Sequence, residues 1–340
     1  MTTIKDIAEM ARVSKGTVSR VINDTPGVGD ETRKRILKII KELDFQPNAS
    51  AQGLAAKRTN NIGLIIPHTG KYSMSNNYWP IVLTEITQQA ALRDYNVLIS
   101  TARTENDINS AYKSILKGRR VDGLIIGSYQ FGEKQMAELM LKDFPYVIIG
   151  RNSYISSNYV DVDGVAGTCR MTEHLINLGH REIAVLAGPE NFINIQDRVK
   201  GFKDAMNQAG LEPHITHCKY QMDEIVKGTK RILQQQPRPT ALFAVAGDLA
   251  VGVLRAVREM DLKIPDDLAV VFFDDLPFFE SFWPTITAIR QPVEELGAMA
   301  SNLLFTLLEG KTPLNKSVIL PTEVIVRESC GSKLKINPKD

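Results

Sequence analysis

Residues 15–23 read KGTVSRVIN and bring two cations, two hydroxyls and one amide into one short segment. Arg and Lys side chains bind the O6 and N7 acceptors of guanine in a DNA major groove. Hydroxyl and amide side chains donate hydrogen bonds to phosphate oxygens. If the segment is a helix with its valines turned inward, its outer face carries candidate DNA contacts. These are Lys15, Gly16, Thr17, Ser19, Arg20 and Asn23.

Two adjacent acids, Asp274 and Asp275, follow the apolar run AVVFF. Consecutive residues of an extended chain point to opposite sides. We therefore predict that one carboxylate contacts a ligand and that the other holds a structural partner. Two neighbouring acids are by themselves weak grounds for acid–base catalysis.

Motifs of catalysis are missing from the sequence. It contains no GxGxxG after a strand, no GxxxxGK[ST], no HExxH and no GxSxG. The five histidines show no metal-ligand spacing with cysteines or acids, and the three cysteines form no CxxC pair. The sequence therefore predicts no enzyme, no metal site and no cofactor, and the separated thiols fit a reducing compartment.

Charge is distributed unevenly along the 340 residues, although the formal net charge is only +2. Residues 1–60 hold 11 Lys or Arg against 7 Asp or Glu, so the remainder is slightly acidic. A basic N-terminal segment indicates a local anionic partner. Charged residues interrupt the N-terminus, unlike a signal peptide, and no apolar run reaches the ~18 residues of a membrane span. We expect a cytoplasmic protein that does not enter a membrane.

The spacing of apolar residues predicts three short helices in a DNA-binding domain over residues 1–46. Thr3 is the expected cap of the first helix, Ser14 of the second and Asp30 of the third. The third helix should turn five apolar residues inward: Ile36, Leu37, Ile39, Ile40 and Leu43. A tight turn between the first two helices is typical of a helix-turn-helix motif.

Residues 47–59 form a polar linker with one weak helical pattern. Pro47 ends the third helix, and Gly53 weakens the following segment by about 1 kcal/mol relative to Ala. A helix of fewer than ~12 residues is marginal in water. We expect a linker helix that forms only under some conditions.

Short apolar runs alternate with amphipathic helical segments over residues 60–340. Such strands indicate parallel sheets with helices on both faces. The length exceeds one comfortable sheet, so the predicted fold class is an all-α head followed by a two-lobed α/β domain. The chain should cross between the lobes near residues 159–164 and 289–293. Ligands of such folds bind beyond the carboxyl ends of the strands.

The motifs together resemble one protein family over essentially the whole chain. TIKDIAEMARVSKGTVSRVIN and the segment from VGDETRKRIL to NNIGLIIP resemble the head and hinge of lactose-repressor/galactose-repressor family regulators. TEHLINLGHREIAVLAGP, IPDDLAVVFFDD and PTITAIRQPVEELG continue the resemblance in order. Within the family, SNNYWPIVLTEI and DRVKGF are similar to segments of maltose-type members.

This resemblance implies a transcription repressor with a periplasmic-binding-protein-like body that binds palindromic operator DNA as a homodimer, or as a tetramer built of two dimers. It implies control by a small effector, here a sugar such as maltose or another α-glucoside. Leu54 matches a hinge residue that enters the minor groove. Arg198, Asp274 and Trp79 match effector contacts, and we include Tyr78, beside Trp79, in the same predicted site.

Two positions depart from the family pattern. Gly247 stands where many members have an effector-contacting asparagine, and Gly16 stands where a base-reading side chain is common.

Other roles are open for two of the predicted site residues. Trp79 could instead pack in the core, as aromatic residues commonly do, and Leu54 could dock the linker on the body. Two other functions stay open, a sugar-binding protein without a DNA function and an α/β enzyme acting on sugars. The basic head opposes the first, and the missing catalytic motifs oppose the second.

Overall fold

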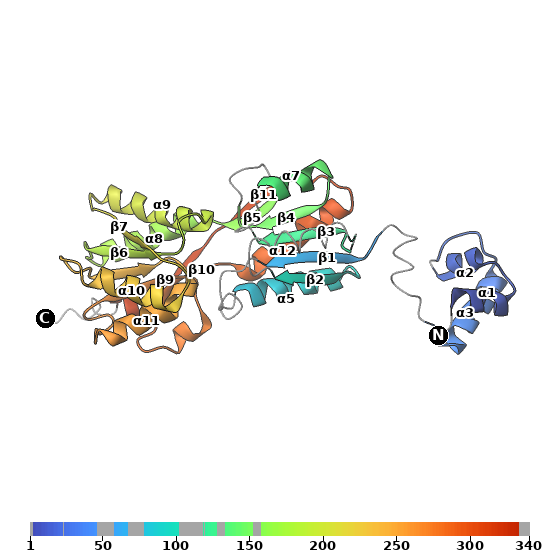
Figure 1. Ribbon diagram of the computed structural model, residues 1–340, viewed down its shortest axis with the longest axis horizontal. Coiled ribbons are helices and arrows are strands. Elements are labelled where there is room, and N and C mark those ends of the chain that lie inside the picture. The colour runs from blue at the N-terminus through green and yellow to red at the C-terminus, as the bar shows by residue number, and fades with distance from the viewer. Residues whose placement is uncertain are drawn as a thin grey trace. The chain divides into compact units, whose positions relative to one another are not determined.

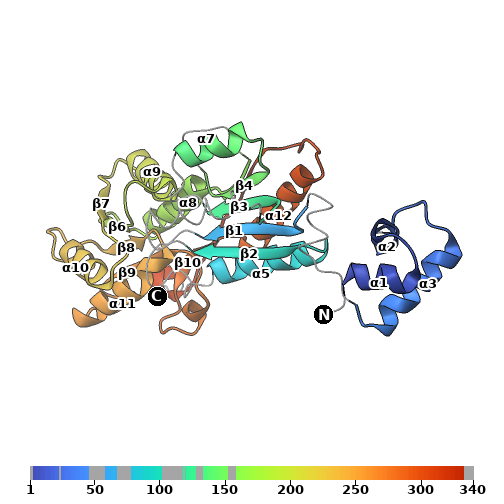
Figure 2. The same cartoon turned by 45° about the vertical axis from the view of Figure 1, so that its right-hand side comes forward.

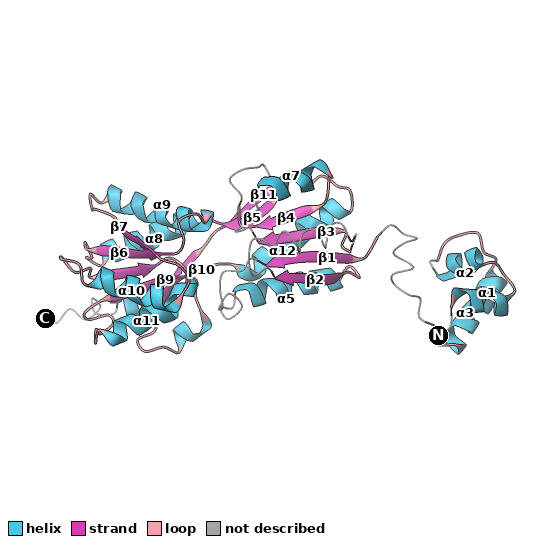
Figure 3. Ribbon diagram, in the orientation of Figure 1, coloured by secondary structure: helices cyan, strands magenta, loops and turns pink. Residues whose placement is uncertain are grey.

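A computed structural model describes residues 3–22, 24–45, 58–66, 78–101, 118, 120–127, 133–151 and 158–332. Contacts divide the chain into two compact units, Met1–Asn60 and Asn61–Asp340, and each is described by itself. Helices make up the first unit, whereas the second unit has sheets between helices (Figure 3). None of the described helices combines the length and apolar character that crossing a bilayer requires.

Three helices form the first unit: α1 (Ile4–Ala11), α2 (Lys15–Ile22) and α3 (Asp30–Glu42). Thr3 caps α1 as predicted, because its Oγ1 accepts from Asp6 N at 3.4 Å while its own N donates to Asp6 Oδ2 at 2.8 Å. Ser14 caps α2 as predicted, since its Oγ accepts from Thr17 N at 3.1 Å. Side chains from all three helices close one small core.

Two predictions for α3 were wrong. Asp30 is the first helical residue, and Gly29 is the cap residue without a side-chain bond. Leu37 is 48% exposed, whereas Ile36 is completely buried. The inner residues follow the helical spacing of three and four from Ile36, and Leu37 is turned about 100° away from that stripe. The inner stripe consists of Ile36, Ile39, Ile40 and Leu43.

The first lobe of the second unit is a parallel sheet in the order β11-β5-β4-β3-β1-β2. Its strands are β1 (Asn61–Ile66), β2 (Asn96–Thr101), β3 (Gly123–Gly127), β4 (Tyr146–Ile149), β5 (Tyr159–Val162) and β11 (Ser317–Leu320). Its helices are α5 (Tyr78–Ala91), α7 (Glu133–Leu141) and α12 (Val293–Leu308). Helices α5 and α12 pack together over one face of the sheet, and α7 lies over the other (Figure 1).

The second lobe has the strand order β12-β10-β9-β8-β6-β7. Its strands are β6 (Ile183–Ala187), β7 (His214–His217), β8 (Ala241–Ala244), β9 (Ala269–Phe273), β10 (Thr287–Arg290) and β12 (Glu323–Ile325). Helices α8 (Gly164–Asn177) and α9 (Ile193–Gln208) cover one face, and α10 (Met222–Leu233) and α11 (Ala250–Glu259) cover the other (Figure 1). The edge strand β12 runs antiparallel to β10, whereas the sequence predicted only parallel pairing.

The chain crosses between the lobes three times. The crossings lie between β5 and α8, between β10 and α12, and between β11 and β12. The third crossing, around residues 321–322, was not predicted from the sequence. Figure 2 shows the two sheets as separate bodies, and each carries its own buried apolar clusters. Three separate connections therefore join two independently packed bodies.

Candidate functional site

Helix α2 turns the predicted DNA-contact residues away from the core of the first unit. Val18 and Val21 are 0% and 3% exposed, which fixes the inner face of the helix. Of the predicted DNA contacts on this helix, Lys15, Gly16 and Arg20 are exposed, and Thr17 and Ser19 are half-buried. The helix thus presents two long cations beside a residue without a side chain.

Cations of the first unit differ in what they contact. Arg33 is tied to the loop after α2, because its Nη1 lies 2.5 Å from Asp24 Oδ1 and its Nη2 donates to Thr25 O at 3.0 Å. Lys15 and Arg20 make no ion pair with any described residue. Both α2 cations are therefore available to an anionic partner.

The other predicted contacts of this region have different positions. Thr17 Oγ1 lies 2.9 Å from Ser14 Oγ, so its hydroxyl takes part in the cap at the start of α2. Asn23 and Leu54 lie outside the described residues. Their assigned roles stay predictions from the sequence.

A cavity lies between the two lobes beyond the carboxyl ends of β4, β8 and β9. This is the edge at which open parallel sheets bind ligands. Four residues predicted to contact an effector come from distant parts of the sequence, and the structure brings them all into this lining. They are Tyr78, Trp79, Arg198 and Asp274.

Asp274 lies in the cavity wall directly after β9. Its Oδ2 accepts from Gly247 N at 2.7 Å, and its Oδ1 accepts from Nε2 of Gln291, which stands at the second crossing. The sequence predicted an extended chain that points Asp274 and Asp275 to opposite sides. An extended chain here was wrong, because the φ angle of Asp274 is 80°. The backbone leaves the strand conformation at Asp274, and this turn sends the two side chains apart.

Arg198, on α9, is held in one orientation beside the cavity and is only 5% exposed. Its Nη1 donates to Val245 O at 2.9 Å, and its guanidinium carbon lies 3.6 Å from the centre of the Phe273 ring. The nearest carboxylate oxygen, Asp274 Oδ2, is 3.9 Å from Nη1. Hydrogen bonding, ring stacking and charge together fix this side chain.

Aromatic rings line the cavity from both lobes. Trp79 is 4% exposed and belongs to the core of the first lobe, so core packing accounts for most of its surface. Tyr78 packs edge-on against it at 5.4 Å between ring centres and is the more exposed of the two. From the second lobe, Phe192 and Tyr220 form a stacked pair at 6.3 Å. The sequence did not predict this second pair.

A charged cluster in the lining was also missed. Arg151 follows β4, and it donates from Nε to Asp161 Oδ2 at 3.0 Å and from Nη2 to Oδ2 of Asp197 on α9. Burial raises the pKa of Asp161, outweighing the hydrogen bond from Val162 N and the charge of Arg151. Because Asp161 belongs to the first lobe and Asp197 to the second, the bonds of Arg151 join the two lobes. The position of Arg151 directly after the apolar run YVIIG was a signal that could have indicated its role.

Gly247 allows a close approach between two loops of the second lobe. A Cβ atom at this position would lie 3.0 Å from both Cβ and Oδ2 of Asp274. Such a distance is tighter than ordinary carbon contacts, so any side chain would press against the carboxylate. The glycine at this departure from the family pattern therefore accommodates Asp274, which takes a hydrogen bond from the Gly247 backbone itself.

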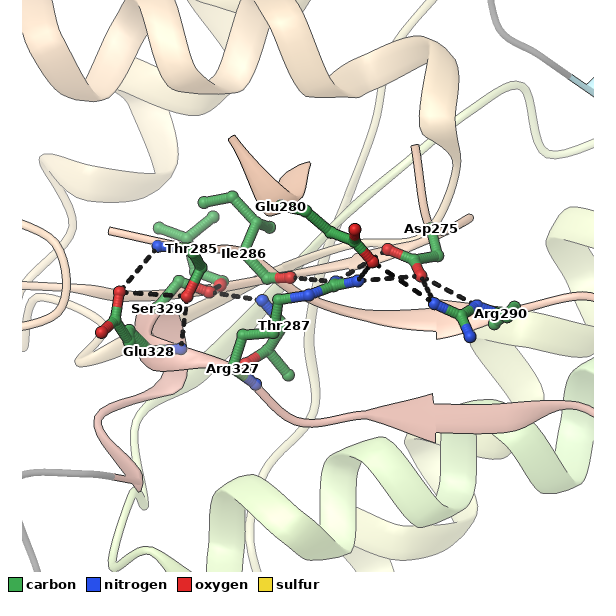
Figure 4. A network of polar contacts seen from close by, with 10 residues as sticks. Asp275, Glu280, Thr285, Ile286, Thr287, Arg290, Arg327, Glu328 and Ser329 are labelled. Carbon is green, nitrogen blue, oxygen red and sulfur yellow. Dashed lines mark hydrogen bonds and ion pairs between the residues drawn. The ribbon is translucent and has the colours of Figure 1, made fainter. Parts of the chain in front are cut away.

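Asp275 is the structural member of the acidic pair. It accepts hydrogen bonds from Arg327 and Arg290, and Arg327 also donates to Glu280 (Figure 4). Burial alone would raise the pKa of Asp275, but the hydrogen bonds and charges of the two arginines hold it below its ordinary value. This network fastens the loop after β9 to the C-terminal segment that follows β12.

That loop also carries exposed apolar side chains on the second lobe. Trp283 is 84% exposed, Phe278 is 40% exposed and Phe282 is 37% exposed, and Val251 on α11 is 55% exposed. All four line one surface groove. Exposed apolar side chains gathered in one groove are typical of surfaces that bind a partner protein or a ligand.

Comparison with known proteins identifies the two units. Residues 3–48 match the model for bacterial regulatory proteins of the lacI family, and residues 172–330 match a periplasmic binding protein-like domain. Catabolite control protein A of Priestia megaterium is 32% identical over 334 residues, which cover 96% of this chain and 98% of that protein. The chain belongs to the LacI family. It is a helix-turn-helix transcription regulator rather than an enzyme.

Solved structures of the LacI family share this architecture. The CelR–cellobiose complex is 28% identical, with a TM-score of 0.74, over 97% of this chain and 100% of that chain. The lac repressor dimer bound to operator and the anti-inducer ONPF is 26% identical, with a TM-score of 0.84, over 97% of this chain and 99% of that chain. The predicted fold class, an all-α head with a periplasmic-binding-protein-like body, is confirmed.

Proposed function

We propose that this LacI-family chain is a homodimeric transcription repressor that binds a palindromic operator and is controlled by a sugar. Support for operator binding comes from α2, which exposes Lys15 and Arg20 without ion-pair partners in the described part of the chain. N-terminal residues of such a helix reach base edges in the major groove. Because Gly16 has no side chain, direct base reading depends mainly on Lys15 and Arg20.

The remaining DNA contacts of the proposal rest on the sequence. Thr17, Ser19 and Asn23 would donate to phosphates, and Leu54 would enter the minor groove at the centre of the operator. Unstacking the central base step costs a few kcal/mol, which the wider contact with bent DNA offsets. Specificity then comes partly from half-site spacing and from the deformability of the central step.

The homodimer of the proposal is supported by the apolar patch of Val251, Phe278, Phe282 and Trp283. Burying these side chains against a second copy would remove apolar surface from water. A similar structure of the family, the lac repressor, is a dimer on its operator. The second copy would supply the second reading helix that a palindrome requires.

The effector of the proposal is a sugar in the interlobe cavity. Arg198 and Asp274 provide a donor and an acceptor for hydroxyl groups, and Tyr78 provides a flat apolar face. The similar CelR structure holds cellobiose. For this chain, an α-glucoside such as maltose remains the effector that the sequence favours.

Control would act through the three crossings between the lobes. A sugar that contacts both lobes favours one lobe arrangement over the other by its difference in affinity for the two. The changed arrangement would separate the paired linkers around Leu54 and release DNA. A corepressor would act with the opposite sign.

Fluorescence anisotropy on DNA from the region upstream of the chain's own gene tests the DNA part of this proposal. Arg20→Ala should weaken binding by about 1–3 kcal/mol and relax the preference for one half-site base. Lys38→Ala is the matched control, because Lys38 pairs with Glu42 on α3, 3.8 Å away. Equal binding by wild type and Arg20→Ala would contradict the assignment of α2.

The effector part needs a separate measurement. Operator affinity is measured with maltose, cellobiose, glucose and ribose, each over a range of concentrations. At least one sugar should change operator affinity, and Arg198→Ala should abolish this response. An operator affinity that no sugar changes would rule out the sugar-controlled repressor.

A further inference from the structure

The charges around the interlobe cavity bear on the chemical class of the effector. Among the described residues, the lining contains four carboxylates and two guanidinium groups, and no other charged side chain. These are Asp161, Asp197, Asp248, Asp274, Arg151 and Arg198. The described lining is therefore acidic, which disfavours an anionic ligand through like-charge repulsion.

Arg151 is the more accessible of the two cations, with a side chain 32% exposed, but it already forms ion pairs with two carboxylates. One partner, Asp161, has a side chain 11% exposed, and the other, Asp197, has a side chain 18% exposed. A phosphate or carboxylate ligand could use Arg151 only by displacing one of them. Displacement would leave a largely buried carboxylate without its cation, which is strongly unfavourable.

Arg198 is also restricted as an anion site. Its side chain is 6% exposed, its Nη1 donates to Val245 O at 2.9 Å, and one face of the guanidinium is covered by the Phe273 ring. Recognition of phosphate by arginine commonly uses two parallel hydrogen bonds from a free edge of the guanidinium. The hydrogen bond and the stacked ring restrict both the edge and the face that Arg198 can offer.

Uncharged hydroxyl groups fit the same lining. A carboxylate has about four lone-pair sites, and two described donors reach Asp274, Gly247 N and Gln291 Nε2. Hydroxyl groups of a sugar can donate to the remaining sites. Tyr78 in one lobe and the Phe192–Tyr220 stack in the other supply flat surfaces for the apolar faces of sugar rings.

We propose that the cavity selects an uncharged saccharide and rejects sugar phosphates and sugar acids, and that Asp197 sets this selectivity by occupying Arg151. The inference rests on the proposed sugar-controlled function and narrows its effector class. Asp197 is the partner that comes from the opposite lobe, so it holds the Nη2 edge of Arg151 from across the cavity.

Isothermal titration calorimetry on the full-length protein tests the proposal. The probes are maltose and cellobiose, the 6′-phosphate and the terminal uronic acid of each, and glucosamine as a cationic sugar. At least one neutral disaccharide should bind at least 30-fold more tightly than its phosphate and its uronic acid. Asp197→Asn should narrow this ratio at least tenfold, because it removes a charge and releases Arg151.

Asp204→Asn is the matched control. Asp204 lies on the same helix, pairs with Lys200 at 2.6 Å, and is not part of the lining. This variant should keep the wild-type ratio. Circular dichroism checks that both variants fold, and the wild-type ratio decides the charge preference even if Asp197→Asn does not fold.

Each result separates this inference from the function it rests on. A phosphate or uronic acid that binds wild type as tightly as the neutral disaccharide overturns the inference and leaves a sugar-controlled repressor standing. The inference is also overturned if glucosamine binds more tightly than every neutral sugar. It is overturned as well if folded Asp197→Asn keeps the wild-type ratio of neutral to anionic sugar affinity. If no saccharide of any charge binds, the proposed function fails together with the inference.

Discussion

The carboxylate of Asp275 binds two arginines that differ in burial, and this difference predicts different losses of stability. Arg327 has a side chain 11% exposed and makes a two-pronged pair with Asp275, at 2.7 Å from Nη1 to Oδ1 and 3.1 Å from Nη2 to Oδ2. It also donates to Ile286 O at 2.6 Å. Arg290, with a side chain 48% exposed, donates from the other side at 2.7 and 3.0 Å (Figure 4).

Arg327→Ala should lower the free energy of unfolding by about 3 kcal/mol. Charge-assisted hydrogen bonds contribute roughly 1.5–3 kcal/mol, and breaking a buried pair costs about 3–5 kcal/mol because one charge stays behind. Asp275 would keep Arg290 as a partner, which places the expected loss toward the lower part of that range. Arg290→Ala should cost only about 0.5–1 kcal/mol, because Arg290 is half-exposed and water screens its charge.

Urea unfolding followed by tryptophan fluorescence measures both losses. The two tryptophans, Trp79 and Trp283, both lie in the second unit, so the signal reports that unit and not the head. Protein concentration must be the same for all variants, because self-association contributes to apparent stability. Equal losses within 0.5 kcal/mol would refute the argument that burial decides the contribution of each arginine.

Two further predictions concern this loop. The folded-state pKa of Asp275 lies below its unfolded value, so its stabilising contribution is present above about pH 4 and is lost as pH falls through the folded pKa. The difference in urea midpoint between wild type and Asp275→Asn should therefore shrink from pH 7 to pH 3. A constant difference would contradict the stabilising role of the Asp275 charge. Phe282→Asp should weaken self-association about tenfold or more in sedimentation equilibrium, because an apolar side chain in a buried interface contributes roughly 1.5–3 kcal/mol. Leu141→Asp, at a residue 88% exposed on α7, is its control, and equal weakening by both would argue against the apolar patch as the interface.

Most of the fold could be predicted from the sequence because its signals are local. Apolar runs such as AVVFF become fully buried strands, and Thr3 and Ser14 cap helices where their side chains can reach backbone N–H groups. Some strands that were not predicted as apolar runs lack such a signal. Strand β7 reads HITH and is half-buried throughout, and β12 is a short edge strand that depends on pairing with β10.

The candidate site was only partly predictable for a related reason. Arg198 and Asp274 came from family motifs, and both line the cavity. Arg151, Asp161 and Asp197 form one cluster only after β4, β5 and α9 are brought together from two lobes. The position of Arg151 directly after YVIIG could have placed it at the ligand-binding edge of the sheet, but no spacing within the sequence encodes its meeting with Asp197.

The adjacency of Asp274 and Asp275 has a mechanical consequence. Asp274 faces the cavity, and the next residue is fastened by Arg327 and Arg290 to the C-terminal segment and to β10. The backbone next to Asp274 is therefore anchored in the closely packed second lobe. Asp274 also accepts from Nε2 of Gln291, a residue of the second crossing. One hydrogen bond, from Gln291 to Asp274, thus connects the cavity wall to a lobe crossing. One peptide bond, between Asp274 and Asp275, connects it to the loop that carries Phe282.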